Sequence, residues 1–134
     1  MVGCPTGYAP AILARLSSSV IALESDEELA DKASETLTEL GIGNAVVVTG
    51  ALEAGYPSEA PYDVIVLGGA VEEVPRPLLE QLKEGGRLVG VVGSGRAAPA
   101  MVYTRTDDDF GARSVFDAYV PPLPGFRKPK SFVF

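Results

Sequence analysis

The sequence predicts an α/β fold, a three-layer sandwich around a mostly parallel sheet that ends in an antiparallel hairpin. Three observations predict it. Short apolar runs alternate with helical patterns along most of the chain. A turn with Gly3 and Gly7 precedes the first helical pattern, as in strand-to-helix turns that approach a ligand. Two β-rich runs joined by turn residues close the series.

Composition narrows the classes of function. The chain has 134 residues, enough for one domain, and a net charge of −7, which argues against a nucleic-acid partner. Cys4 is the single cysteine, so no intrachain disulfide forms, and a reducing, cytoplasmic compartment is expected. The chain has no histidine, which excludes serine-type triads and most zinc sites, and we expect no metal. No apolar run approaches the length of a membrane span.

The first elements follow from spacing. Residues Tyr8 to Leu16 carry apolar residues at helical spacing, with Pro10 in the first turn, and predict a helix. The apolar run Val20 to Leu23 predicts a strand buried on both faces. This strand ends on Glu24, a carboxylate placed where it could accept hydrogen bonds from a ribose.

A second helix and strand follow. Asp26 is a candidate N-cap, with acidic residues after it at the positive end of the helix dipole. Gly41 supplies a left-handed stop, and the valine-rich run Ala45 to Thr49 predicts the next strand. The apolar stripe of this helix consists of Leu29, Ala33, Leu37 and Leu40.

The middle of the chain repeats the alternation. Leu52 to Tyr62 is polar and broken by proline and glycine, so we expect a surface loop with at most one helical turn. Asp63 to Leu67 predicts a buried strand, followed by Gly68 and Gly69. A helix is expected to begin at Pro75 and Pro77 and to run through Leu82, and Arg87 to Val92 predicts another strand.

The C-terminal third has a different pattern. Gly93 to Pro99 is expected to be a flexible connector. Ala100 to Thr106 and Ala112 to Tyr119 flank turn residues 107–111 and predict a hairpin. The acidic turn could suggest a cation site, but a hairpin tip explains it better. Residues 121–134 are proline-rich and basic, and we expect an extended tail outside a domain of residues 1–120. Pro121 to Pro124 resembles a polyproline ligand, but a strap packed along the sheet explains it better.

The order of these segments resembles that of S-adenosylmethionine-dependent methyltransferases with a Rossmann-like fold. In detail the chain is similar to the protein-L-isoaspartate O-methyltransferase family, over about residues 2 to 120. The segments that carry this resemblance are Gly3 to Tyr8, Ala14 to Leu16, Val20 to Glu24, Leu40 to Val48, Ala60 to Ile65 and Leu78 to Val89. The Ala60 to Ile65 and Leu78 to Val89 blocks are the more specific ones.

The resemblance implies a cofactor, S-adenosylmethionine, and an acceptor, a protein or peptide carboxylate. It also implies roles for single residues. Gly3, Cys4 and Gly7 would shape the turn beside the methionine part of the cofactor, and Glu24 would accept from both ribose hydroxyls. Ala51 and Leu52 would lie by the adenine, and Gly68 and Gly69 near the sulfonium. No catalytic residue is implied by name.

Three features depart from the family pattern. Pro5 replaces the central glycine of the turn, and Ala51 stands where relatives carry an aspartate for the adenine amine. The first strand is largely missing, since Met1 and Val2 match only its end, so the chain reads as truncated at its N-terminus. An alternative is therefore a non-catalytic methyltransferase-like protein that acts through protein contacts. A dinucleotide-dependent oxidoreductase fits the terminal hairpin poorly.

The missing strand carries an expectation of its own. The loss of a central strand leaves unpaired backbone on the strands that flank it, and such edges recruit partners. We expect the chain either to self-associate through these edges or to fill the gap with its tail, in which Ser131 to Phe134 could form a strand.

Overall fold

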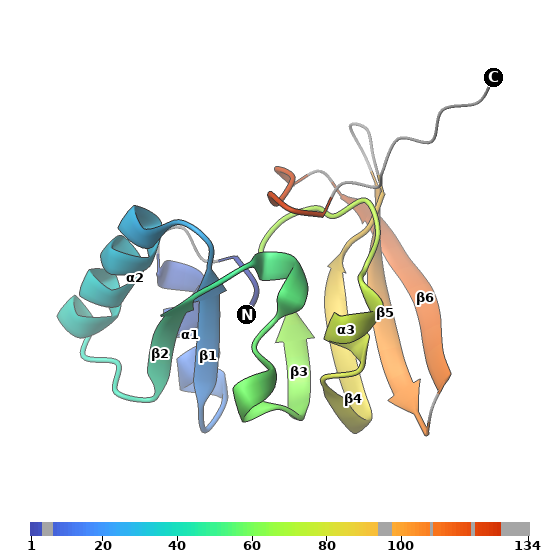
Figure 1. The fold of residues 1–134 in the computed structure, drawn as a ribbon, viewed down its shortest axis with the longest axis horizontal. Coiled ribbons are helices and arrows are strands. Elements are labelled where there is room, and N and C mark those ends of the chain that lie inside the picture. Colours follow the sequence, from blue (N-terminus) through green and yellow to red (C-terminus); the bar gives the residue numbers. More distant parts are fainter. Residues whose placement is uncertain (4–6, 94–97, 108, 119, 127–134) are drawn as a thin grey trace.

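The computed structural model describes residues 1–3, 7–93, 98–107, 109–118 and 120–126 (Figure 1). Its helices are α1 (Tyr8–Leu16), α2 (Glu27–Glu39) and the short α3 (Arg76–Leu79), with 3₁₀ turns η1 (Leu52–Ala54) and η2 (Pro57–Glu59). Its strands are β1 (Val20–Glu24), β2 (Ala45–Thr49), β3 (Tyr62–Val66), β4 (Leu82–Val91), β5 (Ala98–Thr106) and β6 (Asp109–Ala118). Cys4, Pro5 and the proposed strand Ser131 to Phe134 lie outside the described residues.

The strands form two sheets that meet at the N-terminus. β1 pairs with β2 in parallel, while β3, β4, β5 and β6 follow one another in a second sheet. β3 and β4 are parallel, and β4, β5 and β6 are antiparallel, so the predicted C-terminal hairpin is confirmed. Among the residues that the structure describes, Val2 alone bridges the sheets, since it pairs in parallel with Leu23 and with Leu67. We call the line between β1 and β3 the seam, and Figure 1 shows the N-terminus lying in it.

The first half of the chain follows the sequence closely. Helix α1 and strands β1 and β2 have the predicted bounds. Asp26 caps α2, because its Oδ1 accepts from the Glu28 and Leu29 amides at 2.9 and 3.3 Å. One member of the predicted stripe is misplaced: Leu40 is exposed, whereas Ala30 is buried with Ala33 and Leu37.

In the second half of the chain, two elements differ from those predicted from the sequence. The predicted helix through Leu82 ends at Leu79, and Leu82 instead begins β4, where it pairs with Tyr62. The reason is tertiary, because the amide of Tyr62 donates to Gln81 O at 2.7 Å and draws this turn into the sheet. The segment 52–62 holds two 3₁₀ turns, and Leu52 is buried where we expected a surface loop.

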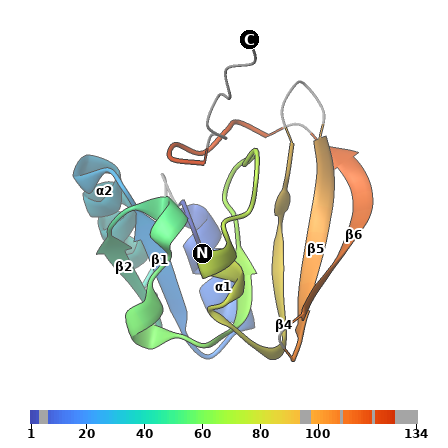
Figure 2. The ribbon, with the colours of Figure 1, turned by 45° about the vertical axis from the view of Figure 1, so that its right-hand side comes forward.

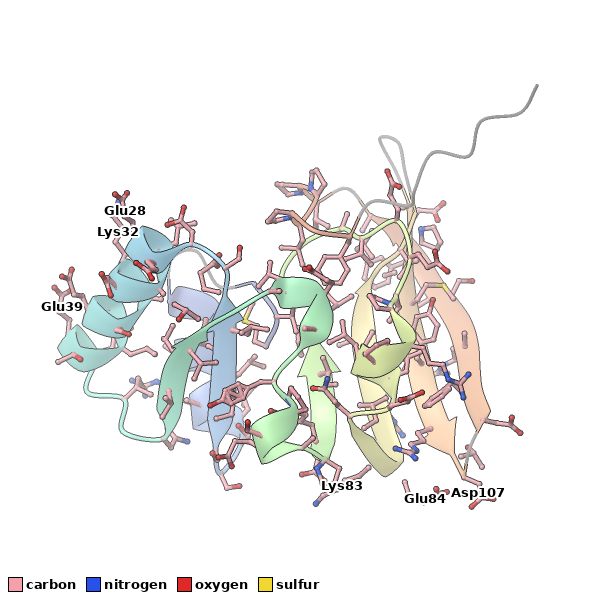
Figure 3. All side chains as sticks on the ribbon, in the orientation of Figure 1. Glu28, Lys32, Glu39, Lys83, Glu84 and Asp107 are labelled. Atoms are coloured by element: carbon pink, nitrogen blue, oxygen red, sulfur yellow. The ribbon has the colours of Figure 1, made fainter. Side chains whose placement is uncertain are left out.

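The hairpin is tighter than predicted. Thr106 pairs with Asp109, so the strand pairing extends into residues that we expected in a five-residue turn. Asp107 adopts a left-handed φ of 54°, and its amide donates to the Glu84 carboxylate at 2.8 Å. Figure 3 shows Glu84 and Asp107 side by side at this end. Strand β4 thus holds the tip in place.

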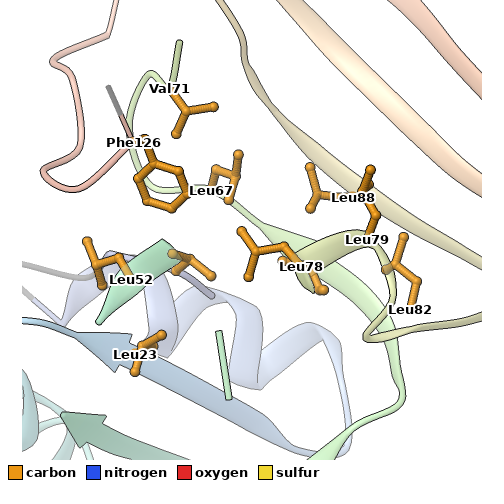
Figure 4. Close-up of a cluster of buried hydrophobic side chains, with 11 residues drawn as sticks. Leu23, Leu52, Leu67, Val71, Leu78, Leu79, Leu82, Leu88 and Phe126 are labelled. Atoms are coloured by element: carbon orange, nitrogen blue, oxygen red, sulfur yellow. The ribbon is translucent and has the colours of Figure 1, made fainter. Parts of the chain in front are cut away.

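The faces of the sheets carry separate cores. Helices α1 and α2 pack on β1 and β2, and α3 packs on β4 and η1 (Figure 2). The α2 side buries Ala22 and Ala33, with Met1 and Val47 packed against them. The main cluster, on the α3 side, contains Val2, Leu23, Leu52, Ile65, Leu67, Val71, Leu78, Leu79, Leu82, Leu88 and Phe126 (Figure 4). The result is the predicted three-layer α/β sandwich, split along the seam.

Candidate functional site

Three of the predicted site residues, Gly3, Glu24 and Gly68, lie at the C-terminal ends of the parallel strands. The amide of Gly3 donates to Leu23 O, and the amide of Gly68 donates to Val2 O, both at 2.8 Å. These bonds bring Gly3 next to the end of β1 and the end of β3. Ligands of open α/β sheets bind outside this edge of the strands, at the point where the strand order reverses.

Glu24 is a buried carboxylate at this edge, with 4% of its surface exposed. Its Oε1 accepts from the Ser25 amide at 2.9 Å and from the Asp26 amide at 3.3 Å. These two amides open the turn into α2, so the turn fixes the orientation of the carboxylate. A carboxylate held in this way can accept further hydrogen bonds from a hydroxyl pair.

The glycines of the edge approach one another closely. A Cβ on Gly68 would lie 2.2 Å from Gly3 O, and Gly3 itself has a left-handed φ of 83°. Only glycine fits at both positions, which leaves bare backbone facing the edge.

Gly7 has a packing role besides the one that the resemblance implies. It precedes α1 with a φ of 80°, and a Cβ there would lie 2.7 Å from Ala33 O. This glycine permits α1 to pack closely on α2.

The two residues expected beside an adenine have opposite environments. Ala51 is exposed and precedes η1. Leu52 is 1% exposed and lies in the main cluster with Phe126 (Figure 4). Of this pair, Ala51 alone presents its side chain at the surface.

A segment that sequence reasoning assigned to the tail covers the same edge. We call residues 120–126 the strap. It is held by the Ala70 amide, which donates to Pro121 O at 2.9 Å, and by its own Leu123 amide, which donates to Ala70 O at 2.8 Å. The Leu123 side chain lies against Gly3, since a Cβ there would meet Leu123 Cδ2 at 2.7 Å. Phe126 is 4% exposed. In the sequence, Phe126 is an isolated aromatic residue within a proline-rich run, and this feature could have indicated that the segment is buried.

Two further polar groups border the seam on the α3 side. Buried Gln81 donates from Nε2 to Ala54 O at 2.9 Å and accepts from the Tyr56 amide at 3.1 Å. The Tyr62 hydroxyl donates to Tyr56 O at 2.5 Å. Burial raises the pKa of Tyr62, and the neighbouring Glu59 adds to the effect. These contacts are structural, because they tie the 3₁₀ turns to β3 and β4.

Among the described residues there is no group of three or more Cys, Asp or Glu side chains that could hold a metal ion. Within the same part of the chain, no helix is long and apolar enough to cross a membrane. What the edge offers is therefore a buried carboxylate, bare backbone at glycines and an apolar floor. Such a set of groups can bind and orient a polar ligand.

The comparisons with known proteins agree with each other. The family model described as Protein-L-isoaspartate(D-aspartate) O-methyltransferase (PCMT) matches residues 1–122. The protein-L-isoaspartate O-methyltransferase of Pseudomonas paraeruginosa is 42% identical over 126 residues, which cover 92% of this chain and 59% of the relative. That of Methanoculleus marisnigri is 46% identical over 92 residues, covering 69% of this chain and 42% of the relative.

Solved structures show the same likeness. A protein-L-isoaspartate O-methyltransferase superposes with a TM-score of 0.85 at 30% identity, covering 92% of this chain and 40% of that one. A putative Plasmodium falciparum homologue in complex with S-adenosyl-L-homocysteine gives 0.73 at 21% identity, covering 90% and 62%; at this identity the likeness concerns the fold. The chain spans less than two thirds of the length of these proteins.

Proposed function

Since the chain belongs to the protein-L-isoaspartate(D-aspartate) O-methyltransferase family, we propose that it forms the cofactor-binding part of a methyltransferase that uses S-adenosylmethionine. The acceptor would be a carboxylate on a protein or peptide. The observation that supports this best is the buried, turn-fixed carboxylate of Glu24 beside the bare backbone of Gly3. The non-catalytic alternative gains no support from the comparisons.

The groups at the edge fit parts of this cofactor. Glu24 would accept hydrogen bonds from the ribose hydroxyls, and Gly3, with Cys4 and Gly7 of the same turn, would shape the backbone beside the methionine part. Ala51 and Leu52 would border the adenine, and Gly68 would lie near the sulfonium. The fit is supported by the close approach of Gly3 O to Gly68, where a Cβ would lie 2.2 Å away, because side chains there would fill the cradle.

For methyl transfer to a carboxylate, the chain would need only to bind and orient the cofactor and the acceptor. The bound cofactor would supply an activated methyl group. A carboxylate acceptor is already ionised at neutral pH, so no side chain needs to remove a proton from it. The absence of histidine is compatible with this reaction. The residues of the edge would align the acceptor and keep water away from the reacting atoms.

The strap limits access to this edge. Leu123 lies against Gly3, and Phe126 packs in the same cluster as Leu52. Entry of the cofactor would therefore move the strap. We assign residues 1–120 to the methyltransferase-like domain and 121–134 to a C-terminal tail that includes most of the strap. A cytoplasmic location and self-association through strand edges remain predictions.

Calorimetric titration with S-adenosylhomocysteine tests the proposal, because the product cofactor needs no acceptor to bind. We expect saturable binding that is weakened at least tenfold in Glu24→Ala. Glu28→Ala is the matched control, since Glu28 is exposed on α2 (Figure 3) and should leave affinity unchanged. Circular dichroism would confirm that both variants fold. Absence of heat at millimolar ligand would refute cofactor binding by this chain, and equal affinity of the two variants would refute the role of Glu24.

A further inference from the structure

Gln81 holds the segment between β2 and β3 with both ends of its side-chain amide. Its Nε2 donates to Ala54 O at 2.9 Å, and its Oε1 accepts from the Tyr56 amide at 3.1 Å. A primary amide has both a donor and an acceptor, so it can pair with the backbone on either side of one residue, as a neighbouring strand would. That residue is Gly55. We call the pairing of Gln81 with Ala54 and Tyr56 the clasp.

Gly55 shows how closely the clasp fits. A Cβ on this residue would lie 2.6 Å from Gln81 Oε1 and 2.6 Å from Cδ2 of Leu78, a member of the main cluster (Figure 4). Gly55 also has a left-handed φ of 64°, which favours glycine. Gln81 itself is 7% exposed. Because a buried amide loses free energy when it is left without hydrogen-bond partners, the clasp resists opening.

The backbone that carries Gln81 is fixed from two sides. The Gln81 carbonyl accepts from the Tyr62 amide at 2.7 Å. The carbonyls on either side of it, Glu80 O and Leu82 O, accept from Arg105 Nη1 at 3.0 and 2.7 Å. The side chain of Gln81 therefore extends from a rigid base, and less conformational entropy is lost when its amide is held in one orientation.

The turn that the clasp holds has few hydrogen bonds of its own. In η1 the Ala54 amide donates to Ala51 O and the Gly55 amide donates to Leu52 O, both at 3.2 Å. A single helical turn fixes several dihedral angles for few hydrogen bonds, so it needs support from outside. The clasp and the burial of Leu52 supply this support.

The same turn lies next to the candidate ribose position. The Gly50 amide donates to Glu24 O at 3.1 Å, so Ala51 and Leu52 follow directly on the strand end beside Glu24. Neighbouring strands lie about 4.8 Å apart. A base attached to a ribose at Glu24 would therefore reach the end of β2 and the residues of η1.

We propose that Gln81 is a positioning residue for the adenine of the cofactor. It acts through η1 and not by contact with the ligand, because the clasp keeps η1 in the conformation that presents Ala51 and the backbone of this turn to the base. This inference rests on the proposed function, since it concerns the same cofactor site. A turn that is already held needs no ordering when the ligand binds, and this preorganisation increases the affinity for the adenine part.

The first test compares two ligands by calorimetry. S-Adenosylhomocysteine carries the adenine, whereas S-ribosylhomocysteine keeps the ribose and the homocysteine and lacks the base. Gln81→Met keeps the length of the side chain and removes both hydrogen bonds of the clasp. We expect this variant to bind S-adenosylhomocysteine at least fivefold more weakly than the unmodified chain does, and to change the affinity for S-ribosylhomocysteine by less than twofold.

Lys83→Met is the matched control for Gln81→Met. Lys83 is exposed two residues further along the same segment (Figure 3). Its ion pair with Asp63, at 3.4 Å, joins two exposed side chains and contributes little to stability. The affinity for S-adenosylhomocysteine should therefore stay the same in Lys83→Met.

The second test uses the unmodified chain, so it does not depend on the folding of a variant. Coupling between two equilibria is reciprocal. If the closed clasp favours binding of the adenine, binding of the adenine must favour the closed clasp. Hydrogen exchange of the Tyr56 amide, followed by NMR, should slow at least fivefold when S-adenosylhomocysteine is saturating. The Ile42 amide, which donates to Leu37 O at 2.9 Å beyond the end of α2, should exchange at the same rate with and without the ligand.

The outcomes separate this proposal from the proposed function. If the unmodified chain binds no S-adenosylhomocysteine, the proposed function fails, and the positioning role fails with it. If the chain binds and Gln81→Met binds equally well, the function stands and the role of Gln81 is refuted. Equal losses for the two ligands would also refute it, because Gln81 would then stabilise only the fold. If Gln81→Met does not fold, unchanged exchange of the Tyr56 amide in the saturated chain is the refuting result.

Discussion

The two ends of the seam are built from the same pair of strands and yet differ in burial and bonding. At the C-terminal end Val2 is 5% exposed and bonded on both sides, with Glu24 and the strap next to it. At the N-terminal end Val64 is 55% exposed. The difference is made by Met1 to Gly3 together with the strap. A few residues are therefore sufficient to complete the edge that carries the candidate site.

The largest expected effect is on stability, when a single carboxylate is placed at one end of the seam or at the other in two separate variants. Val2→Asp would bury a carboxylate among apolar side chains and should cost about 4 kcal/mol of unfolding free energy, enough to unfold a marginal domain. Val64→Asp puts the same charge on an exposed position and should cost at most about 0.5 kcal/mol. Urea denaturation of both variants measures the two values. Similar losses would contradict the contrast between the ends.

The next effect concerns the strap. Phe126→Ala removes a buried ring from the main cluster and should cost about 3 kcal/mol. It should also speed hydrogen exchange of the amides at the C-terminal edge, at Gly3 and Gly68. Phe116→Ala, at an exposed phenylalanine on β6, is the matched control and should change neither quantity appreciably. If exchange at the edge is unchanged in a folded Phe126→Ala, the strap does not cover the edge.

A smaller loss of unfolding free energy is expected when a side chain is added where two backbone segments approach closely. Gly68→Ala drives a methyl group into Gly3 O and should cost about 2 kcal/mol. Gly43→Ala has no atom within 4 Å of the new Cβ and should be neutral within about 0.5 kcal/mol. Thermal unfolding of both proteins gives the comparison. Equal melting temperatures would mean that the glycine pair does not need its present spacing.

The smallest effect is a pH dependence of stability at the N-terminal end of the seam, where Tyr62 begins β3. Burial raises the pKa of Tyr62 above its usual value of 10.0. A raised pKa in the folded state means that the unfolded chain loses this proton first. The contribution of Tyr62 is thus fully present below pH 10 and is lost as the pH rises through the folded pKa. Tyr62→Phe lacks this loss, so the stability difference between the two proteins should shrink above pH 10 in urea titrations.

Sequence patterns predicted those elements that are determined by residues close together in the chain. Asp26 caps α2 because a short carboxylate before an acidic first turn has few other uses. The strand Val20 to Glu24 and the left-handed conformation of Gly41 were also predicted from the local sequence. In the candidate site the same holds for Glu24, whose position at a strand end follows from the strand itself.

The features that the sequence did not predict depend on tertiary contacts. Leu82 has helical spacing from Leu78 and Leu79, but a pairing with Tyr62 places it in a strand, and no neighbour in sequence reveals that partner. The packing of Gly7 against Ala33 also depends on a residue of another helix, so the sequence around Gly7 did not indicate it. Phe126 was hidden in a proline-rich tail because its burial depends on a cluster built far upstream.

The position of Val2 also sets an order of events in time. During synthesis Met1 to Gly3 leave the ribosome before both of their partners, because Leu23 follows later and Leu67 much later. β1 and β2 can pair as soon as both exist, since they are neighbours in the chain. The N-terminal segment can complete its pairing only after β3 has emerged. The seam should accordingly be the last part of the parallel core to form, and the first to open when the chain begins to unfold.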